Sequence, residues 1–274
     1  MLSSLLLASM FTVIHSSDAG VDDVATSVLI AAAQDKNQQE QLDSFEFASV
    51  IITNADCEPI SALSAYQKTI NYLNIPLEVG LSSSRVWTQF PWIWRMDSLA
   101  IDELPCLNRQ INTAKVSSPE GNMLFIDSLK KAADVKLIAT GPLTTIAEVF
   151  KNHPELMKNV SELHWMGGAI DVPGNLDGSP EIPNKLLNDK AEWNVFCDPA
   201  AADWVFTNAP FSIYLYPLDI SDKTIPNDFI TILNQKKETP FSKIISECYK
   251  IVENVKLIAC GMWLQHQECF FQKS

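Results

Sequence analysis

The sequence predicts an α/β fold with a doubly wound, mainly parallel sheet and helices on both faces. Two observations lead to this prediction. Apolar segments of strand length alternate with segments of helical periodicity, and the connections between them suit right-handed parallel crossovers. No linker or internal repeat divides the 274 residues, so we expect a single domain over residues 1–274 with a full hydrophobic core.

The first elements follow a strand, helix, strand order. Residues 10–14 are apolar and β-branched, which predicts a strand, and residues 24–33 have helical periodicity. We expect a polar break at residues 34–44. Residues 45–53, FEFASVIIT, form a dense apolar run that predicts a strand buried on both faces.

The next segments continue this alternation and then depart from it. A helix is predicted over Pro59–Leu73, with the proline at its first position, and residues 76–80 predict a short strand. Residues 81–108 have weak periodicity but many aromatic side chains. Two interpretations stay open: this segment packs its aromatics on the domain, or it forms a wall over a flat apolar ligand.

The second half of the chain alternates in the same way, apart from a polar excursion rich in Pro and Gly at residues 171–190. The expected elements, in chain order, are helix 121–133, strand 135–140, helix 144–152, strand Val160–Met166, a helix opened by Asp198 and Pro199, strand 211–216 and helical segments within 226–267.

The composition excludes some partners. The formal net charge is −13 at pH 7, which disfavours a nucleic-acid backbone or an anionic membrane surface, so we expect neither as a partner. No apolar run reaches the length of about 18 residues expected of a membrane-spanning helix.

The cysteines and the N-terminus indicate the compartment. Six scattered cysteines without a CxxC pair predict reduced, mostly buried thiols rather than a zinc site or a disulfide framework. Residues 1–10 are apolar, but serines interrupt them and they lack the basic region of a signal peptide. We therefore expect a cytoplasmic protein.

An acidic turn follows the first predicted strand. Asp18, Asp22 and Asp23 lie within six residues, around Gly20. Three carboxylates at one strand end repel one another unless a cation, a shared proton or solvent relieves them, and hard oxygen ligands suit Ca²⁺ or Mg²⁺. A helix N-cap is the alternative for Asp22 or Asp23, but it explains neither Asp18 nor the glycine.

Other polar side chains also follow predicted strands. Because the carboxyl ends of parallel strands meet at one edge of a sheet, we expect these groups to line one cleft. Their oxygens and amides suit a polyhydroxylated ligand such as a sugar. Besides the acidic turn, they are Asp56, Thr140, Asn175, Glu192 and Asn194.

Taken in order, these segments resemble the inosine-uridine-type nucleoside hydrolase family, over about residues 10–220. The motifs are SSDAGVDD at 16–23, ATGPLTTIA at 139–147, MGGA at 166–169, PGN at 173–175, AEWN at 191–194 followed by Asp198 and Pro199, and PLD at 217–219. Two further motifs, NADCEP at 54–59 and FPWIWR at 90–95, resemble one branch of that family.

The resemblance implies a calcium-dependent hydrolysis. Asp18 and Asp23 would bind Ca²⁺ together with the backbone carbonyl of Thr140. Asp18 would also be the catalytic general base, acting on a calcium-bound water that attacks the N-glycosidic bond and releases ribose and free base.

The resemblance also implies how the substrate, a ribonucleoside, would bind. Hydrogen bonds to the ribose and packing beside it are expected from Asp22, Met166, Asn175, Glu192 and Asn194. The aromatic segment around Trp94 would help to form the wall of the base pocket, and the protein would form a homodimer or homotetramer. The sequence leaves the base preference open.

The sequence departs from the family pattern at several positions. Ser16 replaces an aspartate, Ala19 replaces a proline, and residues 260–274 lack the expected His-Asp pair. We therefore expect the C-terminal region to be incomplete relative to the family. The alternative function is a catalytically impaired or inactive homologue that binds nucleosides or ribose.

Overall fold

The protein forms one parallel sheet in a computed structural model. The structure describes residues 11–40, 45–108, 120–176, 188–221, 231–232, 235 and 239–253. Within these residues the sheet has six strands in the order β3-β2-β1-β4-β5-β6, and every neighbouring pair is parallel. The strands are β1 (Phe11–Ser17), β2 (Phe45–Ile52), β3 (Glu78–Leu81), β4 (Val135–Ala139), β5 (Val160–Met166) and β6 (Ser212–Tyr216).

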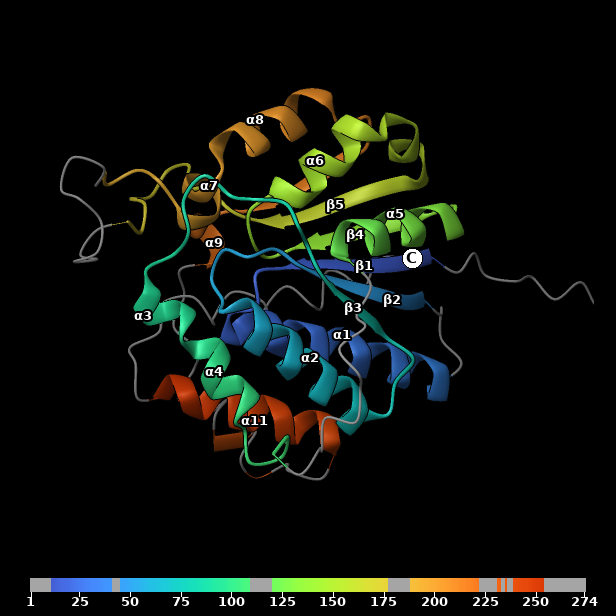
Figure 1. The fold of residues 1–274 in the computed structure, drawn as a ribbon, viewed down its shortest axis with the longest axis vertical. Coiled ribbons are helices and arrows are strands. Elements are labelled where there is room, and N and C mark those ends of the chain that lie inside the picture. The colour runs from blue at the N-terminus through green and yellow to red at the C-terminus, as the bar shows by residue number, and fades with distance from the viewer. Residues whose placement is uncertain are drawn as a thin grey trace, which may run out of the picture.

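Helices cover both faces of the sheet (Figure 1). One face carries α1 (Val21–Glu40), α2 (Pro59–Leu73), α4 (Asp97–Asp102) and α11 (Pro240–Glu253). The other carries α5 (Gly121–Lys131), α6 (Thr144–Asn152) and α8 (Pro199–Asn208). The predicted doubly wound fold is confirmed.

Alternation along the strands divides the core into two layers. Val13 and Val50 face the helices of the α1 side, whereas their neighbours Ile14 and Ile51 face those of the α5 side. Successive side chains of a strand point to opposite faces, so a strand between two helical layers must be apolar throughout. This explains why apolar residues stand at adjacent positions in both strands, such as Val13 and Ile14 in β1 and Val50 and Ile51 in β2.

The strand order also determines where a ligand would bind. The chain winds outward from β1 to β3, then returns to β4 on the other side of β1. This reversal between β1 and β4 is the topological switch point, where the carboxyl ends of the strands leave a crevice. Short helices lie in the connections that follow β3, β5 and β6: α3 (Trp92–Arg95), α7 (Trp193–Cys197) and α9 (Leu218–Ser221), respectively. The short element η1 (Pro154–Asn159) lies between α6 and the start of β5.

Some expected boundaries were wrong. Helix α1 continues to Glu40, so the break expected from residue 34 is absent over the described part of that range. Residues 34–40 are mostly exposed, and their Gln, Lys and Glu side chains favour a helix without needing burial. Strand β1 extends to Ser17, which shortens the acidic turn. Residues 1–10, 41–44 and 254–274 lie outside the described residues.

Two other expectations concern burial. The described cysteines Cys57, Cys106, Cys197 and Cys248 are buried and unpaired, as predicted. None of the helices among the described residues is both long and apolar enough to cross a membrane.

Candidate active site

The acidic turn connects β1 to α1 at the switch point. Ala19 adopts a left-handed conformation with φ of 65°, and its N–H donates to Ser17 Oγ at 2.9 Å. Ser17 Oγ lies 2.8 Å from the Tyr66 hydroxyl of α2, which fixes the turn to the helical layer. A proline has φ near −65°, so the backbone at Ala19 differs from that of a turn with a proline at this position.

Four aspartates surround the turn, and we call Asp18, Asp22, Asp23 and Asp56 the aspartate cluster. A Cβ atom on Gly20 would lie 3.0 Å from Asp23 Oδ2, 3.1 Å from Asp22 Oδ1 and 3.2 Å from Asp56 Oδ2. A Cβ atom at position 20 would therefore crowd the three carboxylate oxygens, which would have to move by a few tenths of an ångström.

Parts of the aspartate cluster are buried without partners. Asp18 and Asp23 are 2% and 3% exposed, while Asp22 and Asp56 are half-buried. Asp18 Oδ2 and Asp56 Oδ1 are buried and accept no hydrogen bond. An unpartnered buried carboxylate oxygen is costly, so these atoms indicate where a cation or a hydrogen-bond donor would bind.

Burial and mutual repulsion disfavour the charged forms of these groups. Burial, followed by the charges of Asp23 and Asp56, holds the pKa of Asp18 well above its usual range. Burial and Asp23 raise the pKa of Asp22 to about 7. A bound cation would reverse this effect by stabilising the carboxylates.

The aspartate cluster fits a hard divalent cation such as Ca²⁺. Its donors are carboxylate oxygens, and two of them lack a partner. In the described part of the chain, however, no three His, Cys, Asp or Glu side chains are gathered closely enough around one point to hold a metal. The donor chemistry fits, and closure around an ion would require the carboxylates to turn.

A buried histidine supports one of these aspartates. His15 Nδ1 lies 2.7 Å from Ser27 Oγ, and His15 Nε2 lies 2.9 Å from Thr140 Oγ1. The Thr140 hydroxyl in turn donates to Asp23. Burial lowers the pKa of His15 to about 3, so the ring is neutral and supplies one donor and one acceptor. The sequence prediction assigned no role to His15, although a histidine among the apolar residues of β1 was a signal.

The polar residues that follow β5 are mostly paired within the protein. Glu192 accepts hydrogen bonds from the backbone N–H groups of Asn194 at 2.8 Å, Gly168 at 2.9 Å and Val195 at 3.1 Å. It thereby caps helix α7. Asn175 Oδ1 accepts from the backbone N–H of Trp193 at 3.1 Å. These residues have a structural role in addition to any contact with a ligand.

Asn194 connects this region to the end of β4. Its Nδ2 donates to the carbonyl oxygen of Thr140 at 2.8 Å and to that of Met166 at 3.1 Å. Its Oδ1 is buried and unpartnered. The structure thus brings Asn194, Met166 and the proposed calcium-binding carbonyl of Thr140 together, as the topology predicts, and leaves one acceptor of Asn194 for a ligand.

The comparisons with known proteins agree with this geometry. A family model described as inosine-uridine preferring nucleoside hydrolase matches residues 13–267. The chain belongs to this family. A solved inosine-uridine preferring nucleoside hydrolase from Bacillus anthracis has a TM-score of 0.79 at 28% identity, covering 95% of this chain and 82% of that one.

The curated relatives match over shorter stretches. A pyrimidine-specific ribonucleoside hydrolase from Shewanella woodyi is 35% identical over 115 residues, and a uridine nucleosidase from Saccharomyces cerevisiae is 28% identical over 135. These alignments cover 42% and 46% of this chain, but 33% and 37% of the relatives. The chain therefore spans about a third of the length of these curated relatives.

The aromatic segment packs on the same edge of this nucleoside hydrolase-family chain. Phe90 stacks on Trp193 with ring centroids 5.0 Å apart, and Trp94 meets Trp193 edge-on at 5.2 Å. Trp193 is 2% exposed, so these rings form a small core of their own. Phe90 and Trp94 thus pack as the first interpretation expected, whereas Trp87 and Trp92 are 69% and 48% exposed. A base-binding role for Trp94 stays a prediction.

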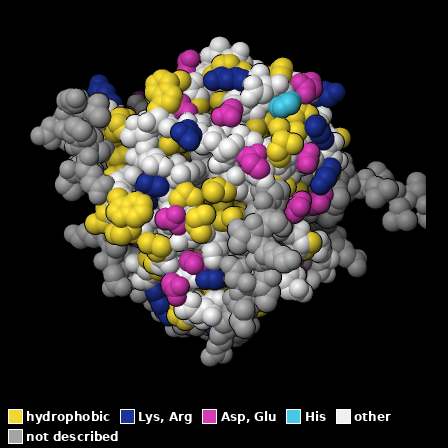
Figure 2. Space-filling view, viewed as in Figure 1, with side chains coloured by type: hydrophobic (Ala, Val, Ile, Leu, Met, Phe, Trp, Pro, Cys, Tyr) yellow, Lys and Arg dark blue, Asp and Glu magenta, His cyan; other side chains and the backbone are white. Residues whose placement is uncertain are grey.

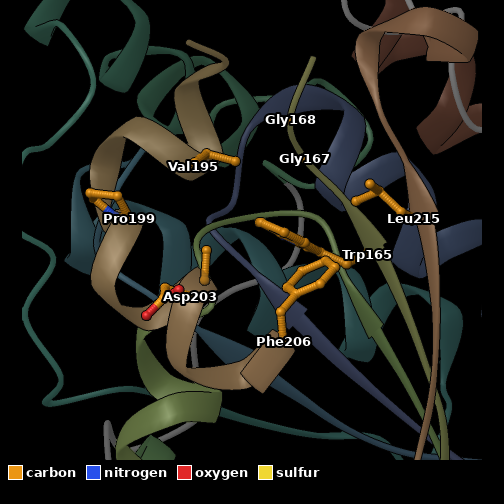
Figure 3. Close-up of a pocket in the computed structure, with 9 residues that line it drawn as sticks. Trp165, Gly167, Gly168, Val195, Pro199, Asp203, Phe206 and Leu215 are labelled. Carbon is orange, nitrogen blue, oxygen red and sulfur yellow. The ribbon is translucent and has the colours of Figure 1, made fainter. Parts of the chain in front are cut away.

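A separate apolar pocket lies between α8 and β6 (Figure 3). Its volume is about 280 Å³, and the rings of Trp165 and Phe206 form part of its wall with centroids 5.6 Å apart. Among the described residues that line it, none belongs to the aspartate cluster and Asp203 is the one charged residue. It lacks the converging polar groups that a nucleoside requires.

The charged side chains do not form one large patch on the face in Figure 2. Acidic and basic groups are interspersed there with apolar side chains. Glu162, on β5, illustrates local pairing: it lies 2.9 Å from His164 Nε2 and 3.3 Å from Lys136 Nζ. His164 is thus a strand residue whose ring nitrogens are satisfied within the protein.

Proposed function

We propose that the protein hydrolyses the N-glycosidic bond of ribonucleosides to ribose and free base. The buried, unpartnered oxygen of Asp18 at the switch point carries this proposal, because Asp18 lies in the acidic turn where the motif resemblance implies a catalytic carboxylate. Membership of the nucleoside hydrolase family supports the reaction class.

The proposed cofactor is Ca²⁺, held by Asp18, Asp23 and the carbonyl oxygen of Thr140. When bound, calcium would fix a water molecule and make it easier to deprotonate. Asp23 is oriented for this purpose by the Thr140 hydroxyl, and Thr140 by His15.

In the proposed reaction, Asp18 accepts a proton from the attacking water. The water oxygen forms a bond to the anomeric carbon as the C–N bond breaks, and the base leaves with the electron pair of that bond and then takes up a proton. Carboxylates of the aspartate cluster stabilise the positive charge that develops on the sugar.

The substrate is proposed to bind through its ribose. Hydrogen bonds to the hydroxyls come from Asp22, Asn175, Glu192 and Asn194, and Met166 packs beside the sugar. The unpartnered Oδ1 of Asn194 supports its assignment. Glu192 retains acceptor capacity, because a carboxylate can accept about four hydrogen bonds and three are used within the protein.

The test is release of free base from uridine and inosine, followed by chromatography with excess calcium and with a chelator. We expect release with calcium and none with the chelator. No release from any common ribonucleoside at high protein and calcium concentrations would contradict the proposal.

A second candidate is a homologue that binds ribose without turnover. Ser16, which stands where the family motif has an aspartate, favours this alternative. Calorimetry that shows ribose binding by a protein without hydrolysis would support it.

Three further properties are proposals. A homodimer or homotetramer is tested by light scattering, and a cytoplasmic location by cell fractionation. The net charge of −13 supports a small-molecule substrate rather than a nucleic acid or membrane surface, which a filter-binding assay tests.

A further inference from the structure

Tyr66 of α2 is 0% exposed, and the proposed reaction assigns no role to its hydroxyl. This hydroxyl lies 2.8 Å from Ser17 Oγ, at the end of β1, and 3.3 Å from Ser27 Oγ, on α1. Helix α2 lies on the same face of the sheet as α1 (Figure 1). One hydroxyl of α2 therefore contacts the elements on both sides of the acidic turn.

The contact with Ser17 supports the backbone of the turn. Ser17 Oγ accepts a hydrogen bond from the N–H of Ala19, whose φ of 65° is unfavourable for a residue with a Cβ atom. Such a conformation persists only where the surrounding structure holds it. Through Ser17, Tyr66 therefore helps to fix the position of the neighbouring Asp18.

Ser27 begins a second path, which ends at the Asp23 carboxylate. This path consists of Ser27, His15 and Thr140, which we call the histidine relay. The Thr140 hydroxyl donates its one hydrogen to Asp23, so Thr140 Oγ1 accepts from His15 Nε2–H. The ring is neutral, so its Nδ1 carries no hydrogen and accepts from the Ser27 hydroxyl at 2.7 Å. Each donor of the histidine relay thus points toward Asp23.

Burial makes these contacts difficult to replace. Tyr66, Ser17, Asp23 and the residues of the histidine relay are all at most 7% exposed, so a lost hydrogen bond leaves a buried polar atom without a partner. Burial, followed by the charge of Asp23, holds the pKa of Tyr66 well above its usual range, so the hydroxyl keeps its hydrogen. Groups that hold a metal ligand without touching the metal change the metal affinity by about 10- to 100-fold when they are replaced.

We infer that Tyr66 is a positioning residue for the proposed calcium site, because its hydroxyl holds the acidic turn through Ser17 and the Asp23 carboxylate through the histidine relay. This inference rests on the proposed function, which makes Asp23 a ligand of the cation. It assigns to a residue of α2 an effect on calcium affinity without contact with the cation or the substrate.

The test removes single hydroxyl groups from the full chain. Tyr66→Phe keeps the ring and its packing, Ser27→Ala interrupts the histidine relay, and a double variant combines the two. Tyr72→Phe is the matched control, because Tyr72 belongs to the same helix and packs on the same part of the core but has no place in the proposed site. Calcium is titrated into each metal-free protein by calorimetry, without substrate and well below the Tm of that protein.

We expect Tyr66→Phe to weaken calcium binding by about tenfold, and Ser27→Ala by about 3- to 10-fold. The loss in the double variant should be smaller than the product of the two single losses, because both substitutions act on Asp23 through the same relay. Tyr72→Phe should bind calcium within about threefold of the wild type. In assays with uridine, the calcium concentration for half-maximal release of base should rise in Tyr66→Phe by the same factor as the dissociation constant.

Three results would overturn the inference while the proposed function stands. The first is calcium binding by Tyr66→Phe within about threefold of the wild type, since a purely structural role lowers Tm without changing the affinity of the folded protein. The second is an equal loss of affinity in Tyr72→Phe, which would indicate a general loosening of α2. The third is a double variant whose loss equals the product of the single losses, which would show that Tyr66 does not act through the relay.

Ser17→Ala and Ser27→Ala replace Tyr66→Phe if that variant does not fold, because each removes one contact of the Tyr66 hydroxyl. Calcium affinity that is weakened in both supports the inference, and unchanged affinity in either overturns it.

Calorimetry also separates this inference from the proposed hydrolysis. If the wild type binds calcium but releases no base, the proposed function fails, and the calcium affinities of the variants still decide the role of Tyr66. If the wild type binds no calcium, Tyr66 has no cation site to position, and the inference is overturned together with the proposed cofactor.

Discussion

The aspartate cluster and the polar residues that follow β5 lie at the same edge of the sheet but differ in how their oxygens are used. Asp18 and Asp56 each have a buried oxygen without a partner. Glu192, by contrast, accepts three backbone hydrogen bonds. An oxygen that the fold does not use indicates a ligand, whereas an oxygen that the fold uses contributes to stability whether or not a ligand binds.

This difference predicts that substitutions in the two regions impair different properties of the protein. Loss of an aspartate should impair ligand binding and chemistry while the fold persists. Loss of Glu192 should reduce the free energy of unfolding even without a ligand. The predictions below test that distinction.

The largest effect is expected for Asp18→Asn. The amide keeps the size of the side chain but cannot take the proton from water, so kcat for uridine should fall by about 10³-fold or more. Steady-state assays of base release measure this. Because the substitution removes one of several repelling charges, the metal-free variant should unfold at the same temperature as wild type or higher. A variant that loses activity only because it is unfolded would contradict the proposed role.

Glu192→Ala should have a large effect on stability. Three backbone N–H groups lose their acceptor and α7 loses its cap, so the free energy of unfolding should fall by about 2–3 kcal/mol. Denaturant unfolding in the presence of a chelator measures the change. If Asp18→Ala lost as much stability under the same conditions, the contrast between the two regions would be wrong.

The metal-free protein should become less stable as the pH rises. Burial and Asp23 raise the pKa of Asp22 to about 7, whereas an aspartate in an unfolded chain has a pKa of about 3.9. The folded state then binds more protons than the unfolded state between these values, so stability is greatest at low pH and falls as the pH approaches 7. With a chelator present, we expect Tm to fall by several degrees between pH 5 and pH 8. A Tm that stays constant or rises over this pH range would indicate that the charged forms of the aspartates do not destabilise the folded protein.

A smaller effect is expected at the turn itself. Ala19 has φ of 65°, which costs about 1 kcal/mol for a residue with a Cβ atom. Ala19→Gly should therefore raise the free energy of unfolding by about 0.5–1 kcal/mol. Ala19→Pro should lower it by about 2 kcal/mol or more, because proline cannot adopt this φ and lacks the N–H that donates to Ser17. Thermal unfolding of the two variants tests whether stability rises in Ala19→Gly and falls in Ala19→Pro.

Much of the fold could be predicted because its signals are local. The apolar runs of β2 and β5 and the proline that opens α2 mark their own elements. The acidic turn could be located as well, because the order of strand, acids and helix is visible in the sequence. The end of α1 could not, since an exposed polar helix and a polar loop have the same composition.

The supporting contacts depend on tertiary structure. His15, Ser27 and Thr140 meet only through the pairing of β1 with β4 and the packing of α1, so the sequence did not link them. Likewise, Asp56 could be assigned to the edge of the sheet, but its unpartnered oxygen appears only in three dimensions. The sequence predicts which polar groups meet at the edge of the sheet, and the structure shows which of their oxygens have no hydrogen-bond partner within the protein.

The account can be tested most directly by the effect of calcium on thermal unfolding of the wild type, Asp18→Asn and Glu192→Gln. A ligand at about 100 times its dissociation constant stabilises a protein by about 2.7 kcal/mol, or about 5–10 °C in Tm for a domain of this size. We predict such a rise for the wild type and for Glu192→Gln, and none for Asp18→Asn. No rise in the wild type, or an equal rise in Asp18→Asn, would contradict the claim that Asp18 binds the cation.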